Sequence, residues 1–147
     1  MHASIGYKVC YHGDDIADRS RLVIVELEIT GMNNEKHNKP FGTYRCSEAR
    51  VRRIWDPTTD EELRMTNERS EGAPAHAIIT GFTPVIYRLN ETVRPVNGYD
   101  HEDGLFACGI HYVKSVQAAM MLAVSWSGHL IDEHVVPQTW RTLSSHS

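Results

Sequence analysis

The segment from Leu22 to Ile29 constrains the fold more than any other part of the chain. Its odd-numbered positions are apolar throughout, whereas its even-numbered positions change from Leu22 and Ile24 to Glu26 and Glu28. Because successive side chains of a strand point to opposite faces, one face of this strand is core along its whole length and the other meets solvent halfway along. Such a strand needs further strands beside it.

Shorter segments supply those strands. Apolar stretches that end at Gly, Pro, Asn or Asp predict strands at residues 6–11, 49–55, 77–80, 85–89 and 105–113. The fourth of them is expected to continue through a turn into a partner strand and so form a hairpin over residues 85–95.

Residues 115–126 give the strongest helix prediction, because apolar residues recur along them at spacings of three and four. Ser127 and Gly128 are expected to end this helix. Residues 58–69 predict a short exposed helix, in which Thr59 caps an acidic first turn. The whole pattern predicts an α+β fold with a mainly antiparallel sheet and one principal helix packed on it.

Length and composition indicate a single globular domain spanning residues 1–147. A chain of 147 residues, 41% of them hydrophobic, suffices for one core and is too short for two. The tail from about residue 138 is expected to fray, although Trp140 should pack against the rest of the domain.

Charge, hydropathy and cysteine content exclude several classes of partner. A formal net charge of −4 argues against binding to extended nucleic acid. The longest apolar run, residues 118–124, is too short to cross a membrane, and the first residues lack the basic and apolar stretches of a secretory signal. Three cysteines without a Cys-x-x-Cys pair fit reduced thiols, so we expect a cytoplasmic protein without a disulfide framework.

Basic residues are concentrated around the predicted strand 49–55, as Arg45, Arg50, Arg52 and Arg53. Alternation places Arg50 and Arg52 on one side about 7 Å apart, a separation suited to bidentate recognition of phosphate or carboxylate. The same charges also suit an edge strand whose arginines pair with Glu26 or Glu28 of a neighbouring strand.

Arg53 favours the ligand site slightly over the edge strand. Alternation places it on the same face as Val51 and Trp55. A charge on such an apolar face needs a partner, and a ligand is one candidate for it.

His111 is the most interesting single position. It lies within an apolar segment beside Tyr112, two residues after Gly109, which permits close approach of the backbone. Two interpretations remain open: a buried histidine with a hydrogen-bonded partner, or a ligand-binding donor or general base near the acidic loop 100–103. Tyr112 would add an aromatic surface to such a site.

No cofactor and no metal ion is expected. The histidines and carboxylates of residues 129–134 lack the spacing of a metal-binding helix, and Cys108 cannot contact His111 from the same strand. Signatures of a serine triad, a phosphate-binding glycine loop and a dinucleotide fold are missing too. A familiar enzyme class therefore has no positive support.

Several segments resemble an uncharacterised domain of phage and giant-virus proteins that often lies beside pentapeptide repeats. The matching stretches cover most of residues 5–125, and the most distinctive are Arg45-Cys46 and Gly109-Ile110-His111-Tyr112; the others are Gly6-Tyr7-Lys8, residues 23–27, the rest of 44–51, Cys108 and residues 87–95. The resemblance implies a viral origin and a compact α+β module, and it supplies no reaction.

Three functions compete on this basis. The favoured one is a non-enzymatic viral protein that binds a small anionic ligand, such as a nucleotide signal of host defence, and that could form a homo-oligomer. The residues expected to bind the ligand are Arg45, Arg50, Arg52, Arg53, His111 and Tyr112. The second is a phosphodiesterase or transferase that acts on a nucleotide, with His111 as acid or base and Arg53 as electrostatic stabiliser. The third is a structural or protein-interaction module.

Overall fold

The computed structural model describes residues 4–13, 15–36, 43–63, 75–77, 85–96, 98–99 and 109–145. The elements in these ranges are β1 (Ser4–His12), β2 (Leu22–Ile29), β3 (Tyr44–Cys46), β4 (Ala49–Asp56), β5 (Glu61–Leu63), β6 (Ala75–Ala77), β7 (Ile86–Tyr87), β8 (Thr92–Val93), β9 (Ile110–Tyr112), α1 (Val116–Trp126), the 3-10 turn η1 (Glu133–Val135) and α2 (Gln138–Ser145).

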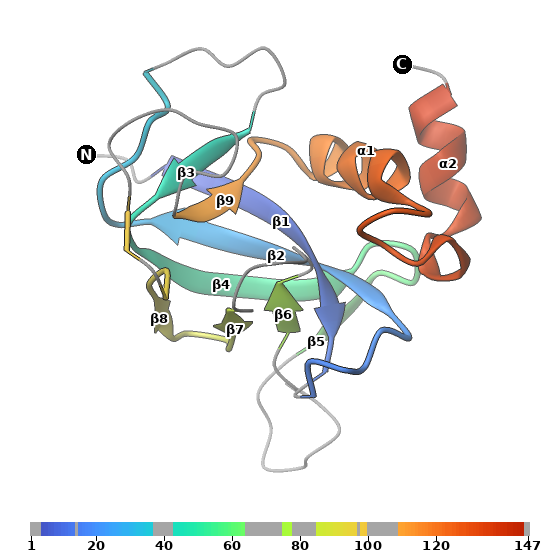
Figure 1. The fold of residues 1–147 in the computed structure, drawn as a ribbon, viewed down its shortest axis with the longest axis horizontal. Helices are drawn as coiled ribbons and strands as arrows, with labels where there is room; N and C mark the ends of the chain where they lie inside the picture. The colour runs from blue at the N-terminus through green and yellow to red at the C-terminus, as the bar shows by residue number, and fades with distance from the viewer. Residues whose placement is uncertain are drawn as a thin grey trace.

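The strands form a curved antiparallel sheet and a separate two-stranded ribbon. The sheet has the order β5-β4-β2-β1-β6-β7, with β8 also paired to β4, and the ribbon consists of β3 and β9. The ribbon lies beside β1 at one end of the molecule, and the helices lie at the other end (Figure 1). The predicted α+β class, a mainly antiparallel sheet with one principal helix, is confirmed.

The strand β2 has the two faces that its sequence predicts. All its odd-numbered side chains are buried in one core, whereas Leu22 and Ile24 are buried in a second core on the opposite face. Glu26 and Glu28, further along that second face, are partly exposed. The strand lies between β1 and β4, so its backbone hydrogen bonds are satisfied on both edges.

The first core fills the concave side of the sheet, and β6, β7, β8 and the β3–β9 ribbon help to enclose it. The second core lies between the sheet and the helices. Ser115, predicted as the first residue of this helix, is its N-cap and accepts a hydrogen bond from the amide of Ala118; Ala119, Met120 and Ala123 are the buried residues of the helix. No helix in the described part of the chain is long and apolar enough to cross a membrane.

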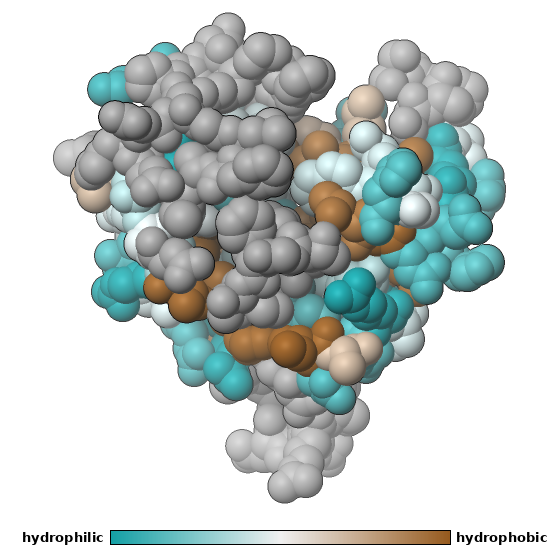
Figure 2. Space-filling view, viewed as in Figure 1, coloured by the Kyte–Doolittle hydropathy of each residue, from teal (hydrophilic) through white to brown (hydrophobic). Residues whose placement is uncertain are grey.

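The tail forms helix α2 in place of the expected frayed end. Trp140, buried to 1% exposure, belongs to the second core, which confirms that this residue packs down. The outward surface of α2 is mostly hydrophilic (Figure 2). The helix is therefore held by tertiary packing of one side, as short helices must be.

The helix predicted for residues 58–69 is wrong over its described part. The chain turns after Asp56 and returns as β5, which pairs antiparallel with the end of β4. Asp60 has a positive φ of 60°, a left-handed conformation that ends any helix. Thr59 caps the turn instead, by accepting a hydrogen bond from the amide of Glu61.

The hairpin predicted for residues 85–95 is also wrong, although the turn exists. Its two strands, β7 and β8, pair with β6 and β4 respectively and not with each other. Asn90, with a φ of 67°, donates its amide proton to the carbonyl of Val51, and Val51 donates to Glu91. These hydrogen bonds attach the turn to β4, so β7 and β8, on either side of the turn, do not pair with each other.

A β-bulge in β4 changes the predicted faces of this strand. Glu26 is opposite Arg53 and Leu27 is opposite Val51, so Arg52 is an extra residue in the ladder. After the bulge the alternation is inverted, and Trp55 joins the second core while Ile54 joins Val51 in the first. The prediction that Arg53 shares a face with both Val51 and Trp55 is therefore wrong.

Candidate functional site

Arg45 and His111 are direct cross-strand partners in the β3–β9 ribbon. The residues before and after each of them belong to or pack against the first core, so the two side chains share the opposite face of the ribbon. Cβ atoms of directly opposed residues lie about 5 Å apart. Of the residues that the sequence nominates for a ligand site, the structure brings these two together.

The surroundings of Arg45 combine burial with an aromatic surface. Its side chain is buried, and its guanidinium carbon lies 5.4 Å from the centre of the Tyr99 ring. Gly109, with a φ of 155°, makes room for this arrangement, because a Cβ there would lie only 3.0 Å from the Cβ of Arg45 and 3.3 Å from the Tyr99 ring. Only glycine fits here without displacing both neighbours.

Lys8 is the third basic group beside the pair, and sequence reasoning did not find it. Its Nζ donates a hydrogen bond of 2.9 Å to the carbonyl oxygen of His111 and lies 5.9 Å from the centre of the Tyr87 ring. The backbone of Tyr7, the residue before Lys8, forms an antiparallel bridge with Val113. Beyond Lys8, β1 pairs with β6. Because β1 and β9 diverge here, the Lys8 amine donates to the His111 carbonyl in place of a backbone amide of β1.

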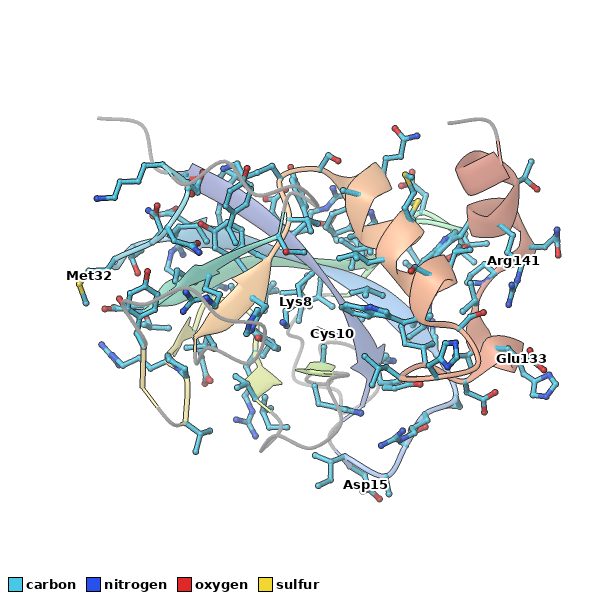
Figure 3. All side chains as sticks on the ribbon, turned by 45° about the horizontal axis from the view of Figure 1, so that its top comes forward. Lys8, Cys10, Asp15, Met32, Glu133 and Arg141 are labelled. Carbon is cyan, nitrogen blue, oxygen red and sulfur yellow. The ribbon has the colours of Figure 1, made fainter. Side chains whose placement is uncertain are left out.

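The Lys8 side chain is buried among uncharged groups. Figure 3 shows Lys8 and Cys10 near the middle of the molecule, whereas Asp15 and Met32 lie at its edges. No described carboxylate lies within ion-pair distance of the Lys8 amine. Burial lowers the pKa of Lys8, because a low-dielectric environment disfavours the ammonium form.

Burial also lowers the pKa of His111 to about 4, and the positive charges of Lys8 and Arg45 lower it further. The imidazole is consequently neutral at pH 7 and has one nitrogen to donate and one to accept a hydrogen bond. The group as a whole contains two cations and one neutral imidazole, drawn from β1, β3 and β9. We call Lys8, Arg45 and His111 the basic cluster.

The depressed pKa of His111 predicts an acid-sensitive fold. The unfolded imidazole takes up a proton near pH 6.5 and the folded one near pH 4, so stability is lost as the pH falls from 6.5 to 4. After a discount for screening of this partly exposed side chain, we expect a loss of about 2 kcal/mol. Urea unfolding at pH 7 and pH 4 should show this loss in the wild type and in the exposed control His129→Asn. The loss should be smaller by that amount in His111→Asn, and an equal loss in all three proteins would contradict the prediction.

Tyr112 lies on the other side of the ribbon from His111. Its ring is buried in the first core and its hydroxyl donates a 2.7 Å hydrogen bond to Glu35. Glu35 also accepts a hydrogen bond of 2.6 Å from Ser4 and forms a 2.9 Å ion pair with Lys114, which in turn contacts Ser4. Hydrogen bonds from these three groups lower the pKa of Glu35 despite burial. The carboxylate is therefore too weak a base to activate Ser4, and the network ties loop 30–36 to β1 and β9.

Arg50 and Arg52 contact a single carboxylate on the second-core face of the sheet. Their guanidinium nitrogens lie 3.5 Å and 3.9 Å from the same oxygen of Glu28. This is the partner that the edge-strand interpretation names, although β4 is an inner strand, flanked by β2 on one side and by β5 and β8 on the other. Neither residue is among the charges that act on His111.

Arg53 has its partners within the chain. Its Nε donates a 3.1 Å hydrogen bond to Glu62 of β5, and its guanidinium carbon lies 4.1 Å from the centre of the Trp55 ring. Ion pairing and stacking on an aromatic face satisfy a guanidinium well. The structure thus divides the nominated arginines into Arg45 beside His111 and three paired arginines on the opposite face of the sheet.

Other nominated groups carry no separate site within the described ranges. Cys10 and Cys46 are free, and burial raises the pKa of each thiol to about 12, so both are protonated and poor nucleophiles. The described residues contain no group of three His, Cys, Asp or Glu side chains that could hold a metal ion. The acidic loop 100–103 and Cys108 lie outside the described residues.

The alternation of β1 was the available signal for Lys8. Gly6, Lys8 and Cys10 occupy alternate positions, and the latter two are buried on the concave side. Lysine is almost never buried unless it is paired, so a lysine between a glycine and a cysteine on the inward face of a strand indicates a specific interaction. By contrast, no local pattern marks Tyr99, which reaches Arg45 from a loop.

The family comparison covers most of the elements that carry the basic cluster. The model of DUF5758, a family of unknown function, matches residues 2–119, which include β1 through β9 and the start of α1. No curated protein and no solved structure matches the chain. Because the match spans well over half of its length, the chain belongs to this family of unknown function, DUF5758.

Proposed function

We propose that the chain binds a small anionic ligand at the basic cluster and does not transform it. One observation carries the proposal: the buried Lys8 amine has no carboxylate partner among the described residues, and its charge and that of the buried Arg45 both act on His111. Buried charges are stable when they are paired, and an anion would supply the countercharge that no described carboxylate gives to Lys8.

The ligand class that best suits this cluster is a nucleotide. A guanidinium and an ammonium together suit phosphate oxygens, and the neutral His111 imidazole adds a hydrogen-bond donor. The similarity of this chain to a domain of phage and giant-virus proteins supports a viral origin. On this proposal the protein acts in the host cytoplasm and sequesters a nucleotide signal of host defence.

The alternative of a phosphodiesterase or transferase ranks second. A general base works best when its pKa lies near the working pH. The pKa of His111, about 4, lies well below neutrality, because Lys8 and Arg45 add their charges to the effect of burial. A neutral imidazole of this kind is a better hydrogen-bonding group than a base, which favours binding over turnover.

Isothermal titration calorimetry with the full chain tests the proposal. The probes are cyclic nucleotides and ADP-ribose at pH 7.5 and low salt, and the variants are Lys8→Met and the matched control Lys36→Met, which removes the same charge from an exposed position. We expect at least one probe to bind with fixed stoichiometry, and Lys8→Met to weaken that binding about tenfold or more. Lys36→Met should bind as the wild type does.

Two results would overturn the proposal. One is the absence of binding heat with every probe. The other is unchanged affinity in Lys8→Met while circular dichroism shows that the variant is folded. Native mass spectrometry of the same samples reports the number of ligands per chain and the oligomeric state.

A further inference from the structure

His76 is a buried histidine whose ring nitrogens have no hydrogen-bond partner in the described part of the structure. It is the middle residue of β6 and lies opposite Tyr11 of β1 on one side and Ile86 of β7 on the other. The residue is 2% exposed and stacks on the Tyr11 ring, with the ring centres 5.6 Å apart. Buried polar atoms without partners are rare, because each has lost its hydrogen bonds to water without replacement. The closed position of β6 therefore carries a free-energy cost that disappears when His76 meets water.

The strands β6 and β7 are weakly attached to the rest of the sheet, at one end of its strand order (Figure 1). β6 pairs with β1 only over residues 10–12, whereas β2 pairs with β1 over residues 4–11. β7 pairs with no described strand other than β6. It carries Tyr87, whose ring centre lies 5.9 Å from the Lys8 amine and which shares the first core with Cys10. Detachment of β6 from β1 would therefore move Tyr87 and uncover the concave side of β1.

We propose that β6 and β7 together are the gate through which the ligand reaches Lys8. This inference rests on the proposed function, because it takes Lys8 as a ligand-binding group. The residue is only 9% exposed, so a ligand as large as a nucleotide needs an opening. A strand with few pairs and two unpaired buried nitrogens needs less free energy to detach than the long inner strands do. Hydration of His76 offsets part of the strand hydrogen bonds that opening breaks.

Thiol labelling measures the opening without any ligand. The full chain is incubated with iodoacetamide under native conditions, and labelled cysteines are located by peptide mass spectrometry. Cys10 and Cys46 are both buried to 0% exposure in the first core, so each reacts only when the structure around it opens. Cys10 lies opposite Ala77 of β6, whereas Cys46 lies in β3 opposite Ile110 and serves as the internal control.

We expect Cys10 to be labelled about tenfold faster than Cys46, or more. His76→Phe keeps the stacking on Tyr11 and removes both unpaired nitrogens, so it should slow the labelling of Cys10 about tenfold and leave that of Cys46 unchanged. His76→Leu, with a smaller apolar side chain, should act in the same way, and the exposed control His129→Phe should change neither rate. The association rate of a nucleotide probe, measured by stopped flow, should fall with the labelling rate of Cys10.

The outcomes separate the gate from the proposed function. If Cys10 is labelled no faster than Cys46, or if both His76 variants fold and leave its rate unchanged, β6 is not a gate, and the calorimetric test of binding is unaffected. Slower labelling with an unchanged association rate would mean that the ligand enters elsewhere. If Cys10 is labelled as expected but no nucleotide probe binds, β6 opens, the proposed function fails, and the gate has no ligand to admit.

Discussion

Replacing Trp140 with alanine is expected to lower the free energy of unfolding by about 3–5 kcal/mol. Trp140 is 1% exposed and fills the second core between the sheet and α1. Its indole nitrogen donates a 3.1 Å hydrogen bond to the hydroxyl of Thr58, in the turn that joins β4 to β5. The substitution removes one of the two buried tryptophans of this core, and the cavity would be lined by residues of the sheet that cannot collapse into it.

Two further variants separate packing from other effects. Trp140→Phe keeps most of the ring contacts and loses the hydrogen bond to Thr58, so it should cost about 1 kcal/mol beyond the smaller packing loss. Thr139→Ala changes the exposed neighbour and should lie within about 0.5 kcal/mol of the wild type. Urea unfolding followed by circular dichroism measures all three. If Trp140→Ala lowers the free energy of unfolding by less than 1 kcal/mol, α2 is not packed against the sheet and the tail is frayed.

Trp140 lies in a segment beyond the family match. The match ends at residue 119, within α1, whereas Trp140 and Val136 bury themselves against the sheet from further along the chain. The apolar face that they cover includes Leu22 and Ile24 of β2. The sequence predicted that Trp140 packs down but not the helix around it, because the segment is short and mostly polar, follows Pro137 and ends in serines, which favours a frayed end.

The elements that sequence reasoning predicted correctly are those whose pattern is local and long. The bounds of β2 agree with the prediction at both ends, and α1 begins one residue after its predicted start and ends before Ser127, as predicted. Each carries its own periodicity over eight or more residues. The pairing of short strands has no such signal. Whether β8 pairs with β7 or with β4 depends on the hydrogen bonds of the turn at Asn90. Their partner is Val51, which is far away in the sequence.

The bulge at Arg52 had the largest consequence for the candidate site. Strict alternation assigns Arg53 to an apolar face without a partner, which makes a ligand site attractive. One extra residue in the ladder removes that reason, because it places Arg53 on the ring of Trp55 and beside Glu62. Bulges leave no mark in a single sequence, so the error followed from the assumption of a regular strand.

Arg45 and His111 were nominated separately, and their proximity is a property of the fold. They lie in strands that are separated by nearly half of the chain, and only the register of the β3–β9 ribbon makes them partners. Lys8 joins them because β1 diverges from β9 at that point and leaves a carbonyl for its amine. Both relations depend on long-range strand geometry, so residue types alone could suggest the chemistry of the site but not its composition.

Replacing Gly6 with valine is expected to cost about 3 kcal/mol or more of stability and to weaken anion binding as well. A Cβ at Gly6 would overlap the ring of Tyr112, with the ring Cγ only 2.8 Å away. The ring cannot turn aside easily, because it is 2% exposed and its hydroxyl is held by Glu35 at 2.7 Å. β9 must therefore move away from β1, and the His111 carbonyl would move with it, away from the Lys8 amine.

A double-mutant cycle identifies the contact responsible. In the Tyr112→Ala background the added methyl groups have room, so Gly6→Val should cost at least 1 kcal/mol less there than in the wild type. Urea unfolding of the four proteins gives this coupling energy, and calorimetry with the nucleotide probes shows whether affinity falls with it. Equal costs in both backgrounds would contradict a clash with Tyr112. If the Gly6→Val variant is destabilised but folded and binds nucleotide as the wild type does, the packing of β1 against β9 does not position the site.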